Sequence, residues 1–89
     1  MEILTFIENS NQDWVAEFEA TGDFNLHLER DKKGTITILQ KTYKEGEYAF
    51  SNEFPYYYNN FDFDFTGIIY PKMIKVVSDC EVKIGVVTQ

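Results

Sequence analysis

The sequence predicts an all-β fold, a small antiparallel β-sandwich of the jelly-roll or Ig-like kind with about seven or eight short strands. Two observations lead to this prediction. Apolar and polar residues alternate in six separate runs, and Gly22, Gly34 and Gly46 follow one another at intervals of twelve residues. Alternation places one set of side chains on each face of a strand, and regularly spaced turn residues are typical of sandwiches and barrels. The 89 residues are expected to form one domain, 1–89.

The alternating runs are the predicted strands. They cover Trp14–Ala20, Phe24–Glu29, Thr35–Leu39, Phe61–Phe65, Ile74–Val76 and Val82–Val86. One face of each run supplies the predicted core, because alternating apolar positions point to the same side of a strand. The residues expected to face inward are Trp14, Phe18, Phe24, Leu26, Leu28, Ile36, Ile38, Phe63, Ile74, Val76, Val82 and Ile84.

The first run has a helical alternative. Ser10 resembles a helix N-cap with Asp13 three positions later, and Gly22 is placed to end a helix. A strand is favoured because alternation accounts for Ala16 and Ala20, which helical spacing leaves unexplained.

Turn residues separate the runs. Asp31–Gly34 suits a type I turn closed by a left-handed glycine, and Glu45-Gly46 and Ser78-Asp79 suit two further tight turns. Residues 52–60 form the one loop-like stretch, because Pro55 lacks the N–H that a strand ladder needs.

Composition and charge exclude several classes of function. The net charge of −7 argues against binding to nucleic-acid phosphates. No segment approaches the roughly 18 apolar residues that span a bilayer, and the N-terminus lacks the pattern of a signal peptide. Acids lead the chain, whereas five bases fall between residues 30 and 44, which predicts two surfaces of opposite sign. Cys80 is the single cysteine, as expected of a chain kept in a reducing compartment.

No catalytic or metal-binding pattern stands out. Asp62 and Asp64 lie on one face of a predicted strand, roughly 7 Å apart, and are interpreted as a solvated face. His27 has no second histidine or nearby cysteine to share a metal, and Cys80 is interpreted as a buried apolar thiol. We therefore expect no enzyme activity, no metal, no cofactor and no small-molecule substrate.

The aromatic segment is the candidate interface. Phe54, Tyr56, Tyr57 and Tyr58 break the alternation, and the chain is 17% aromatic, which is much for a core this thin. Rings on a rigid β-scaffold favour protein contact. The alternative is that these rings fold back over an open end of the sandwich.

Three runs resemble a known group of proteins. Trp14–Phe18, Phe24–Arg30 and Tyr70–Ser78 resemble minor virion proteins of tailed phages, in particular crAss-like and related gut phages. The resemblance implies an auxiliary capsid or decoration protein, or an accessory protein of the collar or tail. It implies capsid or other virion proteins, or a second copy of the chain, as partners. The implied location is the phage virion, after synthesis in the host bacterial cytoplasm. It transfers no catalytic or ligand residues.

Two other functions fit the residues. A soluble acidic protein that blocks a host enzyme by mimicking nucleic acid would explain the charge of −7, although the bases at 30–44 interrupt its acidic surface. A carbohydrate-binding module would use the rings of Tyr56, Tyr57 and Tyr58.

Overall fold

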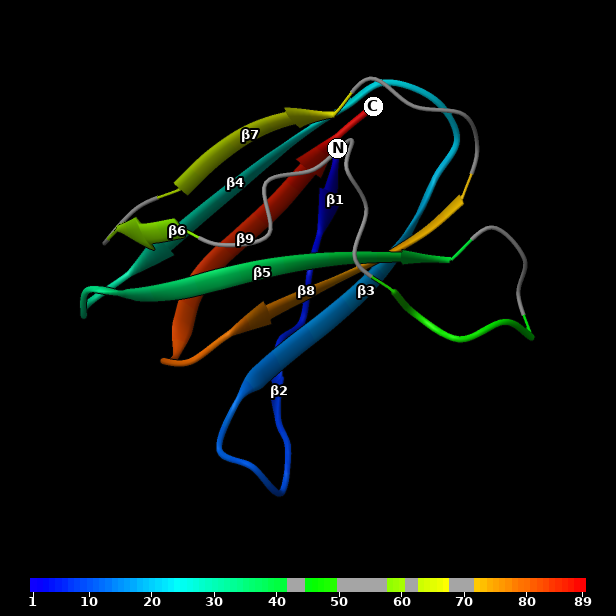
Figure 1. The fold of residues 1–89 in the computed structure, drawn as a ribbon. Coiled ribbons are helices and arrows are strands. Elements are labelled where there is room, and N and C mark those ends of the chain that lie inside the picture. Colours follow the sequence, from blue (N-terminus) through cyan, green and yellow to red (C-terminus); the bar gives the residue numbers. More distant parts are fainter. Residues whose placement is uncertain (42–44, 50–57, 61–62, 68–71) are drawn as a thin grey trace.

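Two antiparallel sheets lie face to face and enclose the core (Figure 1). The computed structural model describes residues 1–41, 45–49, 58–60, 63–67 and 72–89, and for 58–60, 63–67 and 72 it describes the main chain alone. No helix occurs in this part of the chain, so the predicted all-β sandwich is confirmed. The strand interpretation of Trp14–Ala20 is also confirmed, and its helical alternative is wrong.

The described residues contain nine strands. They are β1 (Glu2–Ile3), β2 (Ile7–Glu8), β3 (Trp14–Ala20), β4 (Phe24–Arg30), β5 (Gly34–Lys41), β6 (Tyr58–Asn60), β7 (Phe63–Gly67), β8 (Lys72–Ser78) and β9 (Val82–Thr88). One sheet has the order β1-β9-β4-β7, which we call sheet A, and the other has the order β2-β3-β8-β5-β6, which we call sheet B.

The order of the strands is that of a jelly roll. From β3 onward each strand crosses to the opposite sheet, except that β5 and β6 pair within sheet B. β9 then inserts between β1 and β4, and β8 inserts between β3 and β5. These insertions are the connections of a double-sheet jelly roll, and β2 adds a short strand to one edge of it. Of the two predicted topologies, the strand order selects the jelly roll over the Ig-like one.

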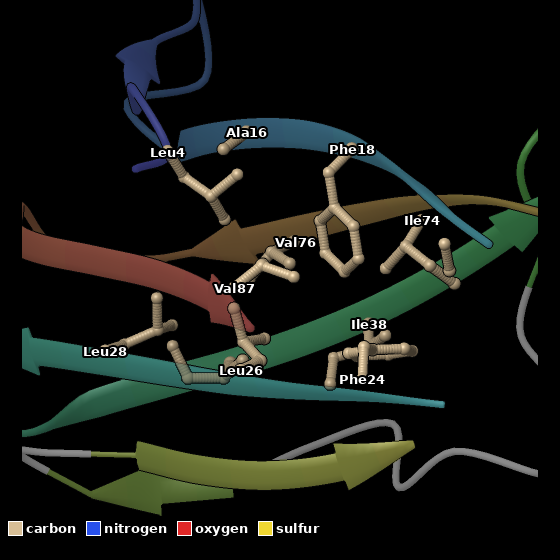
Figure 2. Packing of buried hydrophobic residues seen from close by; sticks show 12 residues of the cluster. Leu4, Ala16, Phe18, Phe24, Leu26, Leu28, Ile38, Ile74, Val76 and Val87 are labelled. Carbon is tan, nitrogen blue, oxygen red and sulfur yellow. The ribbon is translucent and has the colours of Figure 1, made fainter. Parts of the chain in front are cut away.

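The core fills the space between the sheets. In Figure 2 apolar side chains from β3, β4, β5, β8 and β9 point toward one another, and Leu4 enters from the N-terminal segment. Eight of the predicted inward residues are buried: Phe18, Phe24, Leu26, Leu28, Ile36, Ile38, Ile74 and Val76. Phe18 and Phe24 meet edge to face across the two sheets, with ring centroids 5.1 Å apart. Trp14 is half-buried at one end of the sandwich, and the side chain of Phe63 lies outside the described residues.

The prediction for β9 is wrong at Ile84, which is 46% exposed. The pairing of β9 with β4 shifts by one residue at a bulge between Glu29 and Arg30. A bulge of this kind moves every later side chain to the opposite face. Val82 therefore packs against the core, whereas beyond the bulge Gly85 and Val87 take the inward positions.

The N-terminal segment closes one side of the sandwich. β1 pairs with β9 in sheet A, and β2 pairs with β3 in sheet B, so the chain crosses from one sheet to the other between Ile3 and Ile7 (Figure 1). The N–H of Leu4 donates to the carbonyl of Gly85 over 2.9 Å. The ring of Phe6 occupies the space that a side chain on Gly85 would need, so glycine at position 85 makes this crossing fit.

The expected left-handed glycine is absent at position 34. No described glycine has a positive φ, and Gly34 is the first residue of β5. A Cβ at this position would collide with the carboxylate of Asp79 and would lie 2.9 Å from the Cys80 sulfur. Gly34 is thus required by close packing between the β4–β5 and β8–β9 connections. The left-handed residue of the described chain is Gln12, with φ 65°, in the connection between β2 and β3.

Candidate functional site

The predicted interface falls mostly outside the described residues. This is so for Phe54, Tyr56 and Tyr57, and Tyr58 is described only as the first main-chain position of β6, opposite Ile36. The segment therefore enters sheet B at the edge away from β2. Its role as a contact surface stays a prediction.

A cavity of about 540 Å³ opens at the end of the sandwich where three connections between strands meet. We call it the end cavity. Its lining residues lie on the β2–β3, β4–β5 and β8–β9 connections and the strands that flank them. Figure 1 shows the course of these connections. The lining residues are Glu8, Gln12, Trp14, Asp31, Lys32, Lys33, Asp79, Cys80, Glu81 and Lys83. The cavity thus combines one indole with four carboxylates, three ammonium groups, an amide and a thiol.

Arg30 fixes this end of the sandwich from within. Its side chain is fully buried, and the guanidinium donates to the Ser78 hydroxyl over 3.3 Å and to the Gly34 carbonyl over 3.1 Å. The carboxylate of Asp79 lies 4.0 Å away and accepts from the Thr35 N–H over 2.8 Å. A buried charge persists only when hydrogen bonds and an opposite charge compensate for lost water. Arg30 thus ties the β4–β5 connection to β8, and its burial contradicts its expected place in the basic surface.

Cys80 is not the buried apolar thiol expected from the sequence. Its side chain is half-buried and lines the end cavity. The sulfur lies 3.5 Å from an Arg30 guanidinium nitrogen and 3.6 Å from the Lys32 carbonyl oxygen. The thiol therefore lies among polar groups, because the β8–β9 connection that carries it passes beside Arg30.

The outer face of sheet B carries an apolar row. Main-chain register places Ile7 beside Val15, Val15 beside Val77, and Val77 beside Thr37. All four side chains point away from the core, since their neighbours Ala16, Ile36, Ile38, Val76 and Ser78 are buried. Ile7 is 68% exposed, and a groove of about 380 Å³ runs beside it and Val15. The row thus consists of three apolar side chains on β2, β3 and β8 and is continued by Thr37 on β5. A surface of this kind is one that protein partners cover.

Tyr48 covers the part of this face next to the apolar row. Its hydroxyl donates to the Glu17 carboxylate over 3.2 Å, and the ammonium groups of Lys41 and Lys75 lie 4.6 and 5.3 Å from the ring centroid. Burial, followed by the negative charge of Glu17 and the hydrogen bond to it, raises the pKa of Tyr48 to about 12. One tyrosine thus links β3, β5 and β8 on the outside of the sheet.

The outer face of sheet A holds the remaining candidate residues. His27 lies half-buried on this face, as the alternation predicted, with its Nε2 atom 2.8 Å from the Glu29 carboxylate. Asp64 pairs with His27 along the main chain, and Asp62 lies outside the described residues. Ile84, displaced outward by the bulge, and Ile3, 74% exposed, lie toward the other edge of the same sheet.

The described residues contain neither a metal-binding cluster nor a membrane-spanning helix. No group of three or more His, Cys, Asp or Glu side chains there is arranged to hold a metal ion. No helix in those residues is long and apolar enough to cross a membrane. Comparison of the chain with family models, curated proteins and solved structures finds no match.

The end cavity was not predicted from the sequence, although three of the segments that form it were. Asp31–Gly34 and Ser78-Asp79 were both identified as turns, and Trp14 was placed at the start of a strand. The jelly-roll strand order brings these three places together at one end of the sandwich, and without that order their proximity cannot be inferred. The missing information was the topology, which alternation does not contain.

Proposed function

We propose that this chain is an accessory structural protein of a tailed-phage particle, most specifically an auxiliary capsid or decoration protein. It attaches to capsid or other virion proteins through a protein interface and performs no chemistry of its own. The observation on which the attachment rests is the apolar row of Ile7, Val15, Thr37 and Val77 on the outer face of sheet B.

The apolar row is suited to attachment because its side chains are held on a rigid surface. Pairing with β2, β8 and β5 fixes the backbone on both sides of Val15 and Val77. Little conformational entropy is lost when such a surface is covered by a partner. Tyr48 stands beside the row and offers an aromatic ring with a polar tip, a residue type that interfaces favour.

The phage context is supported by two features. The three sequence runs that resemble virion proteins form parts of β3, β4 and β8, which contribute most of the buried core. The jelly-roll order of the strands recurs in viral capsid domains. Because one fold serves many functions, the strand order supports the proposal by analogy alone.

The test is co-sedimentation with particles in a density gradient. The purified protein is mixed with particles of the phage that encodes it, from which the native copy has been removed. We expect the parent protein to move with the particles. The double variant Ile7→Ser, Val15→Ser should fold but remain at the top of the gradient, because two apolar contacts are lost.

The matched control is Ile84→Ser, which removes an exposed isoleucine from the opposite sheet. It should sediment with the particles like the parent. If the parent protein itself fails to sediment with any particle, the proposed function is wrong. If the double variant sediments like the parent, the apolar row is not the attachment surface.

A further inference from the structure

The end cavity has the properties of a ligand site, and nothing in the proposed attachment uses it. Its volume of about 540 Å³ lies within the range of small-molecule pockets. Arg30 and Asp79 join two of its three walls, the β4–β5 and β8–β9 connections, by hydrogen bonds, so that part of its shape is built into the fold. The apolar row shares no residue with it.

Some polar side chains of the cavity already have partners. Lys83 forms ion pairs with Glu81 over 3.2 Å and with Asp31 over 3.6 Å. Asp79 accepts the Thr35 N–H and lies near Arg30. These groups are engaged in holding the β4–β5 and β8–β9 connections together.

Other polar side chains of the cavity are available. In the part of the chain that the structure describes, no hydrogen bond or ion pair engages the side chains of Glu8, Gln12, Lys32 or Lys33. Two of these residues donate hydrogen bonds, one accepts them, and the amide of Gln12 does both. A ligand that enters the cavity therefore meets free donors and free acceptors together.

Trp14 supplies the apolar wall. It is the single tryptophan of the chain and lies half-buried at the open end of the sandwich, where it lines the cavity. An indole presents a broad flat face to a ligand and one N–H at its edge. The ligand that matches has a flat apolar face and a rim of groups that both donate and accept hydrogen bonds.

We propose that the end cavity binds a pyranose sugar, with one C–H face of the ring against Trp14 and the hydroxyl groups directed to Glu8, Gln12, Lys32 and Lys33. Each sugar hydroxyl both donates and accepts, as this mixed lining requires. A phosphate ligand fits less well, because the free carboxylate of Glu8 has no proton to donate and repels a doubly charged anion, and the four carboxylates of the lining outnumber its three ammonium groups. A purely apolar ligand would displace water from the charged side chains around the cavity and give them no hydrogen-bond partner in exchange.

The test uses the fluorescence of Trp14, since no other tryptophan contributes to the signal. The full chain is titrated with glucose, galactose, mannose, N-acetylglucosamine and glucuronate, and with inorganic phosphate as the comparison. We expect at least one sugar to change the emission saturably, with a Kd on the order of millimolar for so small a ligand. Calorimetry on the same sugar should give the same Kd.

Variants separate the cavity from the rest of the surface. Glu8→Gln and the double variant Lys32→Ala, Lys33→Ala should each weaken binding about tenfold, because each removes charged hydrogen-bond partners. Glu19→Gln, an exposed glutamate on β3 away from the cavity, should bind like the parent. The inference is overturned if no sugar of the panel binds at 20-fold the expected Kd (about 20 mM). It is also overturned if phosphate binds more tightly than every sugar, or if the control weakens binding as much as the cavity variants.

Discussion

Glycine 85 shows how a single residue determines the closure of the sandwich. The N-terminal segment crosses from sheet A to sheet B over this residue, and Phe6 lies against it. A Cβ added at Gly85 would lie 2.7 Å from the Phe6 ring and 3.3 Å from Leu28. We expect Gly85→Ala to lower the free energy of unfolding by about 1–3 kcal/mol, because a packed region must move to accept the methyl group. Urea unfolding measures the change.

Gly22→Ala is the matched control for this prediction. No atom lies within 4 Å of a Cβ added at Gly22, and its φ is not positive. This variant should be neutral or more stable by about 0.4–1 kcal/mol, through the loss of freedom in the unfolded chain. Adding Phe6→Leu to Gly85→Ala should restore part of the loss. Equal stability of the two alanine variants would show that Phe6 does not lie over Gly85.

Tyr48 gives the protein a pH dependence at the alkaline end. Its pKa is about 12 in the folded chain, against about 10 for an unfolded tyrosine. Below pH 10 both states hold the proton, so Tyr48 contributes no pH dependence there. Between pH 10 and 12 the unfolded chain releases the proton while the folded chain keeps it, so the free energy of unfolding falls as the pH rises.

The variant Tyr48→Phe isolates this effect. It removes the titrating hydroxyl and its bond to Glu17, so the variant should be somewhat less stable at pH 9. Its stability should then fall less steeply than that of the parent from pH 10 to 12, although the five other tyrosines still titrate in both proteins. Unfolding curves at pH 9, 10.5 and 11.5 provide the measurement. If the stability of both proteins falls equally steeply from pH 10 to 12, the Tyr48 hydroxyl is exposed to water and does not bond to Glu17.

At the scale of the strand, period two predicted the long strands well. β4 and β8 alternate between buried and more exposed residues along their described side chains, β3 and β5 do so over most of their length, and each was identified from the sequence. The short strands β1, β2 and β6 were missed, because so short a segment contains no period, and the loop expected over residues 52–60 is wrong at Tyr58–Asn60, which is β6. These strands form through pairing with β9, β3 and β5, which is a tertiary effect.

β9 shows why alternation fails at a bulge. Val82, Ile84 and Val86 alternate with polar or small residues, but the register shift opposite Glu29 and Arg30 reverses the faces after Val82. Sequence spacing continues unchanged through a bulge, whereas the pairing does not. The inward residue near the end of β9 is Val87, 1% exposed, and nothing in the local pattern distinguished it from Val86.

The observed register of β9 makes a testable contrast. Val87→Ala should lower the free energy of unfolding by about 2 kcal/mol, because it removes buried methyl groups between the sheets. Ile84→Thr should change it by less than about 0.5 kcal/mol, as usual for a surface position. Thermal and urea unfolding of both variants provide the comparison. If Ile84→Thr lowers the free energy of unfolding more than Val87→Ala does, β9 has the uninterrupted register that the sequence suggested.

For the whole molecule, the sequence predicted the core better than the surface. Inward faces follow from alternation, and eight of the twelve predicted core residues are buried. The surface depends on which strands and turns become neighbours, and this is set by the jelly-roll order. Arg30 illustrates the difference, because its sequence position beside Lys32 and Lys33 suggested a basic surface, whereas folding encloses it between the β4–β5 and β8–β9 connections. The apolar row and the end cavity are likewise products of strand order.

The last prediction concerns assembly through the aromatic segment. Tyr58 opens β6 at one edge of sheet B, and the apolar row begins at Ile7 on the opposite edge of that sheet. The rings of Tyr56, Tyr57 and Tyr58 were predicted from the sequence to contact a partner. Tyrosine offers contact area with few rotamers to immobilise and a hydroxyl that can bond across the interface. The triple variant Tyr56→Ser, Tyr57→Ser, Tyr58→Ser should therefore fold and bind particles more weakly than the parent.

Melting and particle binding must be measured on the same preparation, since the two possible roles of these rings differ in folding. A folded triple variant with weakened binding supports a contact role. A folded variant that binds like the parent excludes the segment from the interface and leaves the apolar row to be tested alone. A variant that no longer folds assigns the rings to the core, because small domains have only about 5–15 kcal/mol of stability to lose. Combining the triple change with Ile7→Ser then tests coupling, since residues of one interface give non-additive losses of binding energy whereas independent surfaces give additive ones.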